Sequence, residues 1–270
     1  MIDPEIADYY ERAREESRLT HGPFKLEFER TKELIQRHAP QAPAEVLDVG
    51  GGAGAYALWL AERGYRVHLI DASPRLVEEA RKRSAIARAP LASCAVGDAR
   101  ELSVPDGSAG MVLLLGPLYH LVEEDDRRRA ISEAARALAS GGALIAAAIS
   151  RWASVLDGVA RSLFDDPHFA TIVERDLREG QHRNPTGELN YFTTAYFHKP
   201  EELRHEIAGA GLSVEGLYGI EGPGWMTHNF DERWGDPAKR ETILRIARLI
   251  ESEPAMIGCS AHMLAVGRKP

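Results

Sequence analysis

A glycine loop beside an acid is the first feature of this sequence whose residue types could do chemistry. The run "VLDVGGGAGAYA", residues 46–57, places Asp48 just ahead of Gly50, Gly52 and Ala55. These positions loosely match the pattern G-x-G-x-x-G/A, in which a bare backbone approaches a phosphate at a helix N-terminus. A carboxylate just before the loop would repel pyrophosphate and attract an ammonium or sulfonium. The combination favours a ligand that is nucleoside-like but positively charged.

Two more acids stand at corresponding places. Asp71 closes the apolar run 66–70, where an acid can accept hydrogen bonds from both hydroxyls of a ribose. Asp98 closes the run 93–96 and could accept a hydrogen bond from an adenine amino group. The structural alternatives are a tight turn without a ligand for the glycines and a helix cap for Asp71.

The elements that must position these residues alternate between strand-like and helix-like patterns. The expected strands are 45–49, 66–70, 93–96, the run "MVLLLGPLYHL" from 111, and 143–149; the expected helices are 56–63, 74–89 and 125–139, the last closed by Gly141 and Gly142. Such alternation predicts parallel strands joined by right-handed crossovers. Two further strands, 213–220 and "AHMLAVGRK", complete an α/β fold with a doubly wound, mostly parallel sheet of seven strands.

The whole chain, 1–270, is expected to form one domain. Residues 1–39 are predicted to be a helical lid, and 40–150 a cofactor-binding core. Residues 151–197 break the α/β pattern and are expected to form a cap over the sheet. The pattern resumes at 198–270, which contains a second insertion at 221–254 with an amphipathic helix from Asp236 and Pro237 to Ile250.

Composition limits the partners. The chain has 44% hydrophobic and 27% charged residues and a net charge of −8, which argues against nucleic acid because that affinity comes mainly from Lys and Arg. The acidic start "MIDPEIADYYERAREE" has no apolar signal region, and no apolar run reaches the roughly 18 residues of a membrane helix. The sequence therefore predicts a cytoplasmic protein without a membrane partner. Cys94 and Cys259 are expected to be buried, reduced thiols.

The segments "VLDVGGGAG", "HLIDASP", "VGDAREL" and "MVLLLGPLYHL" resemble the successive motifs of the class I S-adenosylmethionine-dependent methyltransferases, in particular the small-molecule branch called methyltransferase type 11. The resemblance covers residues 40–150 in order and spacing. It implies a Rossmann-like fold, S-adenosylmethionine as cofactor and S-adenosylhomocysteine as product. It also implies in-line displacement of the methyl group onto an oxygen or nitrogen of a small organic acceptor.

The resemblance implies a role for each matching position. Asp48 would orient the ammonium group of the cofactor through the loop. The other implied contacts are with the methionine part (Gly50, Gly52 and Gly54), the ribose (Asp71 and Ala72), the adenine (Asp98 and Ala99) and the transferable methyl group (Leu115 or Gly116).

The segment "YYERAREESRL" resembles the helix that covers the cofactor in this branch. Tyr9 and Tyr10 could close over the methionine part, and Arg18 could grip its carboxylate in a bidentate pair. A solvated amphipathic helix with Glu–Arg pairs at helical spacing is the alternative.

Methyl transfer needs a base only when the acceptor arrives protonated. His120 is the candidate base, with Tyr119 beside it; the alternative is a core or capping histidine. The other open candidates lie in cap-like regions, with capping the simpler interpretation for His198: His21, His168, His182, His198 and His228.

Motif residues that this sequence lacks, and four aromatic residues that it has, give information about the methyl acceptor. Gly116 stands where enzymes that methylate amino groups of nucleic acid or protein glutamine carry Asn or Asp, and the run "AAAIS" lacks the ligands of magnesium-dependent catechol-type enzymes, so no metal is predicted. Four aromatic residues are expected to bind the acceptor, with ordinary packing as the alternative: Tyr191, Tyr196, Phe197 and Trp225.

Two other functions fit the glycine loop. One is an NAD(P)-dependent oxidoreductase, disfavoured by Asp48 and by the absence of an obvious Tyr-x-x-x-Lys. The other is a protein that binds S-adenosylmethionine without turnover. Fold analogy alone cannot name the acceptor.

Overall fold

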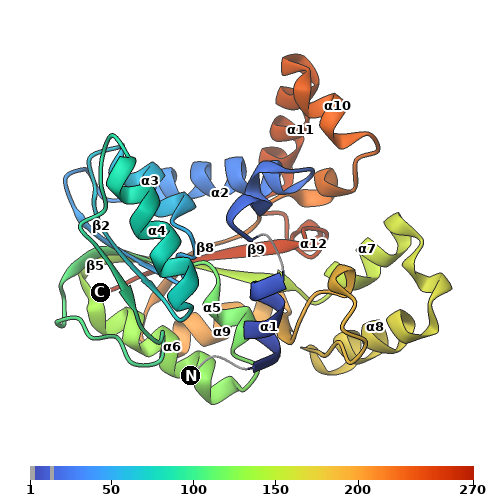
Figure 1. Ribbon diagram of the computed structural model, residues 1–270, viewed down its shortest axis with the longest axis horizontal. Helices are drawn as coiled ribbons and strands as arrows, with labels where there is room; N and C mark the ends of the chain where they lie inside the picture. The colour runs from blue at the N-terminus through green and yellow to red at the C-terminus, as the bar shows by residue number, and fades with distance from the viewer. Residues whose placement is uncertain (1–3, 13–14) are drawn as a thin grey trace.

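A nine-stranded sheet forms the centre of the computed structural model, which describes residues 4–12 and 15–270 (Figure 1). Strands β3, β2, β1, β4 and β5 lie side by side and parallel, and β9 then pairs antiparallel with both β5 and β8. The predicted doubly wound, mostly parallel α/β fold is confirmed. Seven of the nine strands are the predicted ones: β1 Glu45–Val49, β2 Arg66–Asp71, β3 Ser93–Val96, β4 Ala109–Leu114, β5 Leu138–Ser150, β8 Ser213–Gly219 and β9 His262–Arg268. The other two, β6 Gln181–His182 and β7 Ala195–His198, were not predicted and extend the sheet beyond β5.

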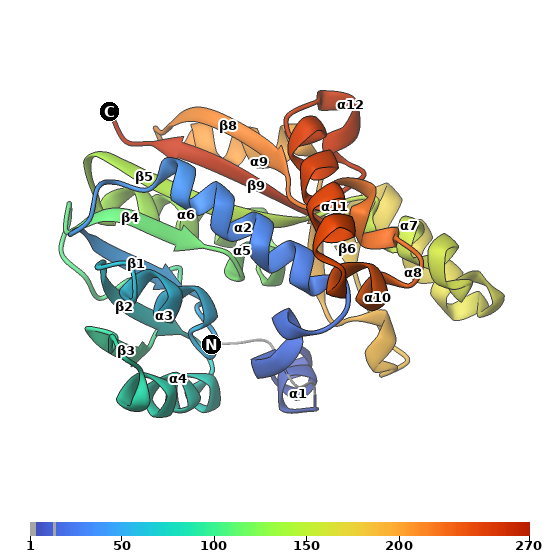
Figure 2. The same ribbon diagram turned by 90° about the horizontal axis from the view of Figure 1, so that it is seen from above.

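Helices cover both faces of this sheet (Figure 2). One face is covered by α2 Phe24–His38, α3 Ala55–Ala61 and α4 Pro74–Ile86; the other by α5 Pro117–His120, α6 Glu124–Ala137 and α9 Pro200–Gly209. Each helix turns a stripe of apolar side chains to the strands, as amphipathic spacing dictates. Leu34 and Ile35 of α2 are fully buried in the first of these layers, so α2 belongs to the core. Of the expected lid, residues 1–39, the described helices outside the core are α1 and η1.

Two boundaries differ from the sequence prediction. Strand β5 begins at Leu138, so Gly141 and Gly142 lie inside it instead of closing the preceding helix. The pairing with β4 shifts register between Ala109 and Met111, and this irregularity takes up the additional residues. The expected fourth strand ends at Leu114, because Pro117 starts the short helix α5, a position where proline is favoured.

Three segments outside this core gather at one end of the sheet, remote from the C-terminus (Figures 1 and 2). They are the N-terminal α1 Pro4–Arg12 and η1 Glu15–Thr20; the cap with α7 Ala153–Arg161, η2 Leu163–Asp165, α8 Pro167–Glu179, β6 Gln181–His182, η3 Leu189–Tyr191 and β7 Ala195–His198; and the insertion with η4 Gly222–Met226, α10 Phe230–Gly235, α11 Pro237–Ile250 and α12 Pro254–Ile257. Strand β7 runs parallel to the last residues of β5, so the cap is attached to the sheet by backbone hydrogen bonds.

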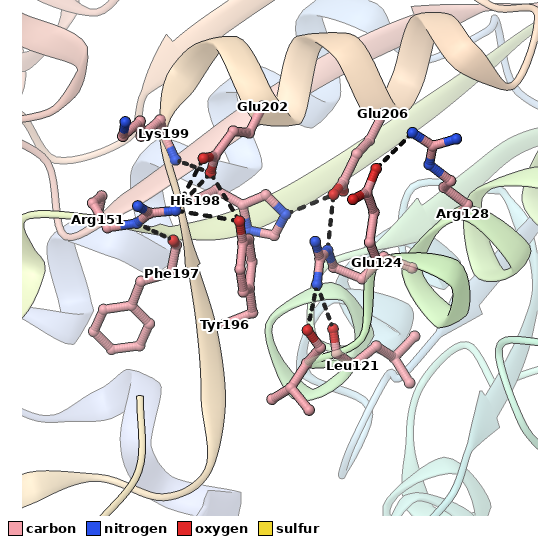
Figure 3. A network of polar contacts seen from close by, with 12 residues as sticks. Leu121, Glu124, Arg128, Arg151, Tyr196, Phe197, His198, Lys199, Glu202 and Glu206 are labelled. Atoms are coloured by element: carbon pink, nitrogen blue, oxygen red, sulfur yellow. Dashed lines mark hydrogen bonds and ion pairs between the residues drawn. The ribbon is translucent and has the colours of Figure 1, made fainter. Parts of the chain in front are cut away.

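A network of ion pairs and hydrogen bonds joins the cap to the core (Figure 3). Arg151, which follows β5, donates to the Phe197 carbonyl at 2.7 Å and to Glu202 at 2.8 Å. Arg127 of α6 donates to Glu206 of α9 at 2.9 Å, and His198 of β7 lies 3.1 Å from the other oxygen of Glu206. These charges are stable in the interior only because each is paired.

Within residues 4–12 and 15–270, no helix combines the length and the apolar character needed to cross a membrane. Cys94 and Cys259 are free thiols, as expected, but each is half-buried and not fully buried.

Replacing Arg127 by Leu should lower the free energy of unfolding by about 3–5 kcal/mol, since Glu206 would keep a buried charge without its cation. The matched control is Arg128→Leu, because Arg128 is exposed and forms an i,i+4 pair with Glu124 on the surface of α6; this change should cost roughly 0.5 kcal/mol or less. Urea unfolding followed by circular dichroism measures both. Equal losses in the two variants would contradict the role given to Arg127.

Candidate active site

A cavity of about 490 Å³ lies at the carboxyl ends of β1, β2 and β4, and we call it the strand-end cavity. Ligands of open α/β sheets bind at this edge, where the strand order reverses. The cavity wall contains ten of the residues selected from the sequence: Tyr10, Gly50, Gly52, Asp71, Ala72, Asp98, Ala99, Gly116, Tyr119 and His120. Residues that are far apart in the chain therefore meet here because their strands end together.

The glycine loop packs closely against Pro117 at Gly50 and borders open space at Gly52. Gly50 has a φ of +73°, and a Cβ there would lie 2.5 Å from Cδ of Pro117. Gly52 has a φ of +55° and nothing within 4 Å of the position of a Cβ, so its backbone is exposed to the cavity. Only glycine meets both demands without strain. Gly54 caps α3 and Leu115 packs among core side chains, and neither lines the cavity.

Asp71 holds the loop in place. Its Oδ2 accepts a hydrogen bond from the Gly52 N–H at 2.8 Å, and its Oδ1 accepts one from the Ser73 N–H at 2.8 Å. Burial raises the pKa of Asp71, and these two amides oppose the rise. Because a carboxylate oxygen can accept more than one hydrogen bond, each oxygen of Asp71 can still accept one from a ribose hydroxyl.

Asp48 lies buried beneath the loop, and neither of its carboxylate oxygens has a hydrogen-bond partner among the described residues. A Cβ on Gly51 would lie 2.8 Å from its Cγ, so the loop packs directly on the carboxyl group. Burial and the charge of Asp71 raise the pKa of Asp48 to about 7. An orphaned buried acid next to an open loop fits a positively charged ligand.

Asp98 is already occupied in this structure. Arg100 donates to its two oxygens at 2.9 and 2.6 Å and to Asp126 at 2.7 Å. The hydrogen bonds from Arg100 hold the pKa of Asp98 well below its usual range. Asp98, the expected acceptor for an adenine amino group, is therefore already paired with Arg100 on the cavity wall.

His120 and Tyr10 join α5 to α1. The Tyr10 hydroxyl lies 2.6 Å from Nε2 of His120, and Nδ1 lies 3.3 Å from the Thr194 carbonyl oxygen. Because a carbonyl only accepts, Nδ1 carries the proton and Nε2 accepts from Tyr10. Burial lowers the pKa of His120 to about 4, so the imidazole is neutral and a weak base.

A second cavity, of about 580 Å³, lies between α1, the cap and η4, and we call it the cap cavity. Three of the four aromatic residues expected to bind the acceptor line it: Tyr191, Phe197 and Trp225. Tyr196 does not, because it neighbours Phe197 in β7 and adjacent strand residues face opposite sides. Its ring packs instead under Arg127, at 3.7 Å. Tyr10 and Tyr119 line both cavities.

Arg18 lies on the wall of the cap cavity, away from the expected position in the strand-end cavity. Its guanidinium forms a bidentate pair with Glu27, with N–O distances of 2.6 and 3.1 Å. Beside this pair, His262 bonds to Glu221 at 2.7 Å. The carboxylates of Glu27 and Glu221 and the ring of His262 gather within 4.8 Å, but each carboxylate already has a nitrogen partner, as in an ion-pair cluster.

The remaining histidine candidates are dispersed. His21, His168 and His228 are exposed, and His198 is paired with Glu206. His182 lines the cap cavity with Nδ1 on Asp176 and Nε2 on the Tyr191 carbonyl. The sequence analysis did not select nine titratable residues that line the cavities, and no local pattern distinguishes them: Glu27, Asp157, Arg161, Glu221 and His262 on the cap cavity, and Arg100, Glu123, Asp126 and Arg183 on the strand-end cavity.

The comparisons with known proteins agree with this geometry. Residues 46–142 match the family model described as "Methyltransferase domain". An uncharacterized methyltransferase of Mycobacterium tuberculosis is 36% identical over 112 residues, which are 42% of each chain. A malonyl-[acyl-carrier protein] O-methyltransferase of Halorhodospira halophila is 30% identical over 202 residues, 70% of this chain and 65% of that protein. The matched regions thus span less than two thirds of these curated relatives.

The fold also matches a solved structure. A SAM-dependent methyltransferase of Methanosarcina mazei superposes with a TM-score of 0.59 at 19% identity, covering 87% of this chain and 96% of that one. The family implies S-adenosylmethionine as the cofactor, and its positive charge and ribose fit the unpartnered Asp48 and the open oxygens of Asp71.

Replacing Asp71 by Ala should raise the Kd for S-adenosylmethionine about 10- to 100-fold, because the loop amides and the ribose hydroxyls both lose their acceptor. Calorimetric titration measures the Kd. Glu45→Ala is the matched control, since Glu45 is an acid at the other end of β1 and lines neither cavity. Unchanged affinity in Asp71→Ala would contradict the assignment.

Binding of the positively charged cofactor should release a proton from Asp48. The free protein holds this group at a pKa of about 7, and a nearby cation favours the ionised form. The Kd for the cofactor should therefore rise by up to ~10-fold per pH unit below about pH 7. Calorimetry in buffers of different ionisation enthalpy counts the protons. Asp48→Asn should abolish most of this release; proton uptake on binding would contradict it.

Proposed function

Since this chain belongs to the class I S-adenosylmethionine-dependent methyltransferases, we propose that it transfers a methyl group to an oxygen or nitrogen atom of a small organic molecule. The observation that carries the proposal is the junction of the two cavities. Tyr10 and Tyr119 line both of them, so ligands in the two cavities would meet at these side chains. Holding two reactants in line, away from water, is the main contribution an enzyme makes to such a displacement.

The strand-end cavity is the proposed cofactor site. When bound, S-adenosylmethionine supplies a methyl group activated by a positive sulfonium. Asp48 would balance the positive charge from beneath the loop, and Asp71 would hold the ribose. Arg183, which lines this cavity and has no ion-pair partner among the described residues, is a cation that could approach a carboxylate.

The cap cavity is the proposed acceptor site. Its volume of about 580 Å³ lies in the range of pockets for small molecules. Tyr191, Phe197 and Trp225 would supply flat apolar walls that exclude water. The relative named as a malonyl-[acyl-carrier protein] O-methyltransferase supports oxygen as one possible target. The net charge of −8 supports an acceptor other than nucleic acid.

His120, Tyr119 and Tyr10 have distinct proposed roles. Tyr119 would orient the acceptor at the junction. The hydrogen bond between Tyr10 and His120 would keep α1 closed over both ligands, and a further hydrogen bond from Arg75 to the Tyr10 carbonyl at 2.7 Å supports this position of α1. His120 is a candidate base only for an acceptor that loses its proton easily, because its own pKa is about 4.

The proposal is tested with S-adenosylmethionine labelled in its methyl group and a panel of phenols, alcohols, carboxylic acids and amines. Label should appear in at least one acceptor, and Tyr10→Phe should reduce kcat/KM about fivefold, the equivalent of one ordinary hydrogen bond. Tyr65→Phe is the matched control, because its hydroxyl donates at 2.8 Å to the Pro40 carbonyl and Tyr65 lines neither cavity. Cofactor binding without product from any panel member would favour a binding protein without turnover.

A further inference from the structure

The Glu221–His262 pair on the wall of the cap cavity has a role that the proposed function does not yet use. His262 is the first residue of β9 and Glu221 precedes η4. Nδ1 of His262 lies 2.7 Å from Oε1 of Glu221, and the backbone N–H of His262 donates to Oε2 at 3.1 Å. Glu221 is only 2% exposed. One buried carboxylate therefore holds His262 at two points, the ring through Nδ1 and the main chain through its N–H.

These contacts fix the state of the ring. A carboxylate accepts hydrogen bonds, so Nδ1 carries a proton and the lone pair of the neutral ring is on Nε2. Nε2 has no hydrogen-bond partner among the residues the structure describes, and the side chain is 15% exposed at the wall of the cap cavity. A histidine oriented by a carboxylate through Nδ1, with Nε2 available to a ligand, is the arrangement of a general base.

The charges around the ring come from three elements. Glu221 precedes η4, Glu27 of α2 lies 3.8 Å from Nδ1, and Arg18 of η1 is paired with Glu27. Burial lowers the pKa of His262, but Glu27 and Glu221 outweigh it and raise the pKa above its usual value, with Arg18 opposing them. His262 is therefore a stronger base than His120, whose Nε2 already accepts from Tyr10.

Glu27 also relates the pair to the helix that follows the glycine loop. Tyr56 of α3 is partly buried, and besides burial the charge of Glu27 contributes to the raised pKa of its hydroxyl.

We propose that His262 is the proton acceptor of the methyl transfer, that Glu221 positions it, and that the acceptor is a hydroxyl compound or amine that enters the cap cavity still protonated. This inference rests on the proposed function. In the step, the nucleophilic oxygen or nitrogen forms a bond to the methyl carbon as the carbon–sulfur bond breaks and its electron pair stays on sulfur. The proton of the nucleophile passes to Nε2, and Glu221 stabilises the imidazolium that results.

The first test needs neither cofactor nor acceptor. Histidine-labelled protein is titrated by NMR, with the His262 signal assigned from His262→Gln. It should titrate above the usual value of about 6.5, and Glu221→Gln should lower this midpoint by ~1 unit or more. The matched control is Glu45→Gln, which alters the histidine–glutamate pair of His68 and Glu45, 2.9 Å apart and on the wall of neither cavity; it should leave the His262 midpoint unchanged. A His262 midpoint at or below the usual value, or one unaffected by Glu221→Gln, would overturn the proposal.

The second test uses the panel acceptor that gives the most product. His262→Gln should reduce kcat by ~100-fold or more while the Kd for S-adenosylmethionine changes less than about threefold. In the wild type, kcat/KM should rise with pH through the midpoint found by NMR, and Glu221→Gln should move that rise to lower pH with KM nearly unchanged. His68→Gln should match the wild type.

The outcomes separate the two proposals. If the cofactor binds and methyl transfer occurs, but His262→Gln keeps the wild-type rate and pH profile, the proposed function stands and the role of His262 is refuted. If no cofactor binds, or no acceptor is methylated, the proposed function fails and the catalytic role of His262 fails with it, whatever the titration shows.

Discussion

The close contact between the glycine loop and the start of α5 is the constraint on which both cavities depend. Strands β1 and β4 are neighbours in the sheet and end side by side, so the segments that follow them must share the same space. They fit because Gly50 and Gly116 lack side chains: a Cβ on Gly50 would lie 2.5 Å from Pro117, and one on Gly116 would lie 3.2 Å from the Gly50 carbonyl oxygen. This packing sets the start of α5, which carries Tyr119 and His120.

The cap depends on a different kind of contact. It is joined to the sheet by a short parallel pairing at the end of β5 and by buried charges around Arg127 and Arg151. Such pairs add little net stability compared with apolar packing, yet breaking one is costly. They therefore restrict the cap to one position over the sheet, where it forms the cap cavity together with α1 and η4.

The sequence predicted the part of the site that local pattern determines. The acids Asp48, Asp71 and Asp98 each lie at or close to the carboxyl end of a strand. Because parallel pairing brings these ends together, their common edge of the sheet follows from the sequence pattern. Contacts between distant loops have no such rule: Tyr10 meets His120 from 110 positions away, and Glu221 meets His262 from 41. Tyr196 shows the limit of prediction even within one strand. The sequence located the aromatic cluster, but it did not tell which of the neighbouring rings, Tyr196 or Phe197, faces the cavity.

The two cavities draw on different parts of the chain, so the proposed cofactor site and the proposed acceptor site are built largely from separate segments. Nearly all of the strand-end cavity comes from the segment that matches the methyltransferase model, whereas Tyr119 is the one described residue of that segment on the wall of the cap cavity. Most positions of the cap and η4 can therefore change without altering the wall of the strand-end cavity, to which α1 contributes Ile6 and Tyr10 and the cap contributes Arg183. The positions that line only the cap cavity are therefore those at which acceptor specificity can diverge, in evolution or in a mutagenesis library.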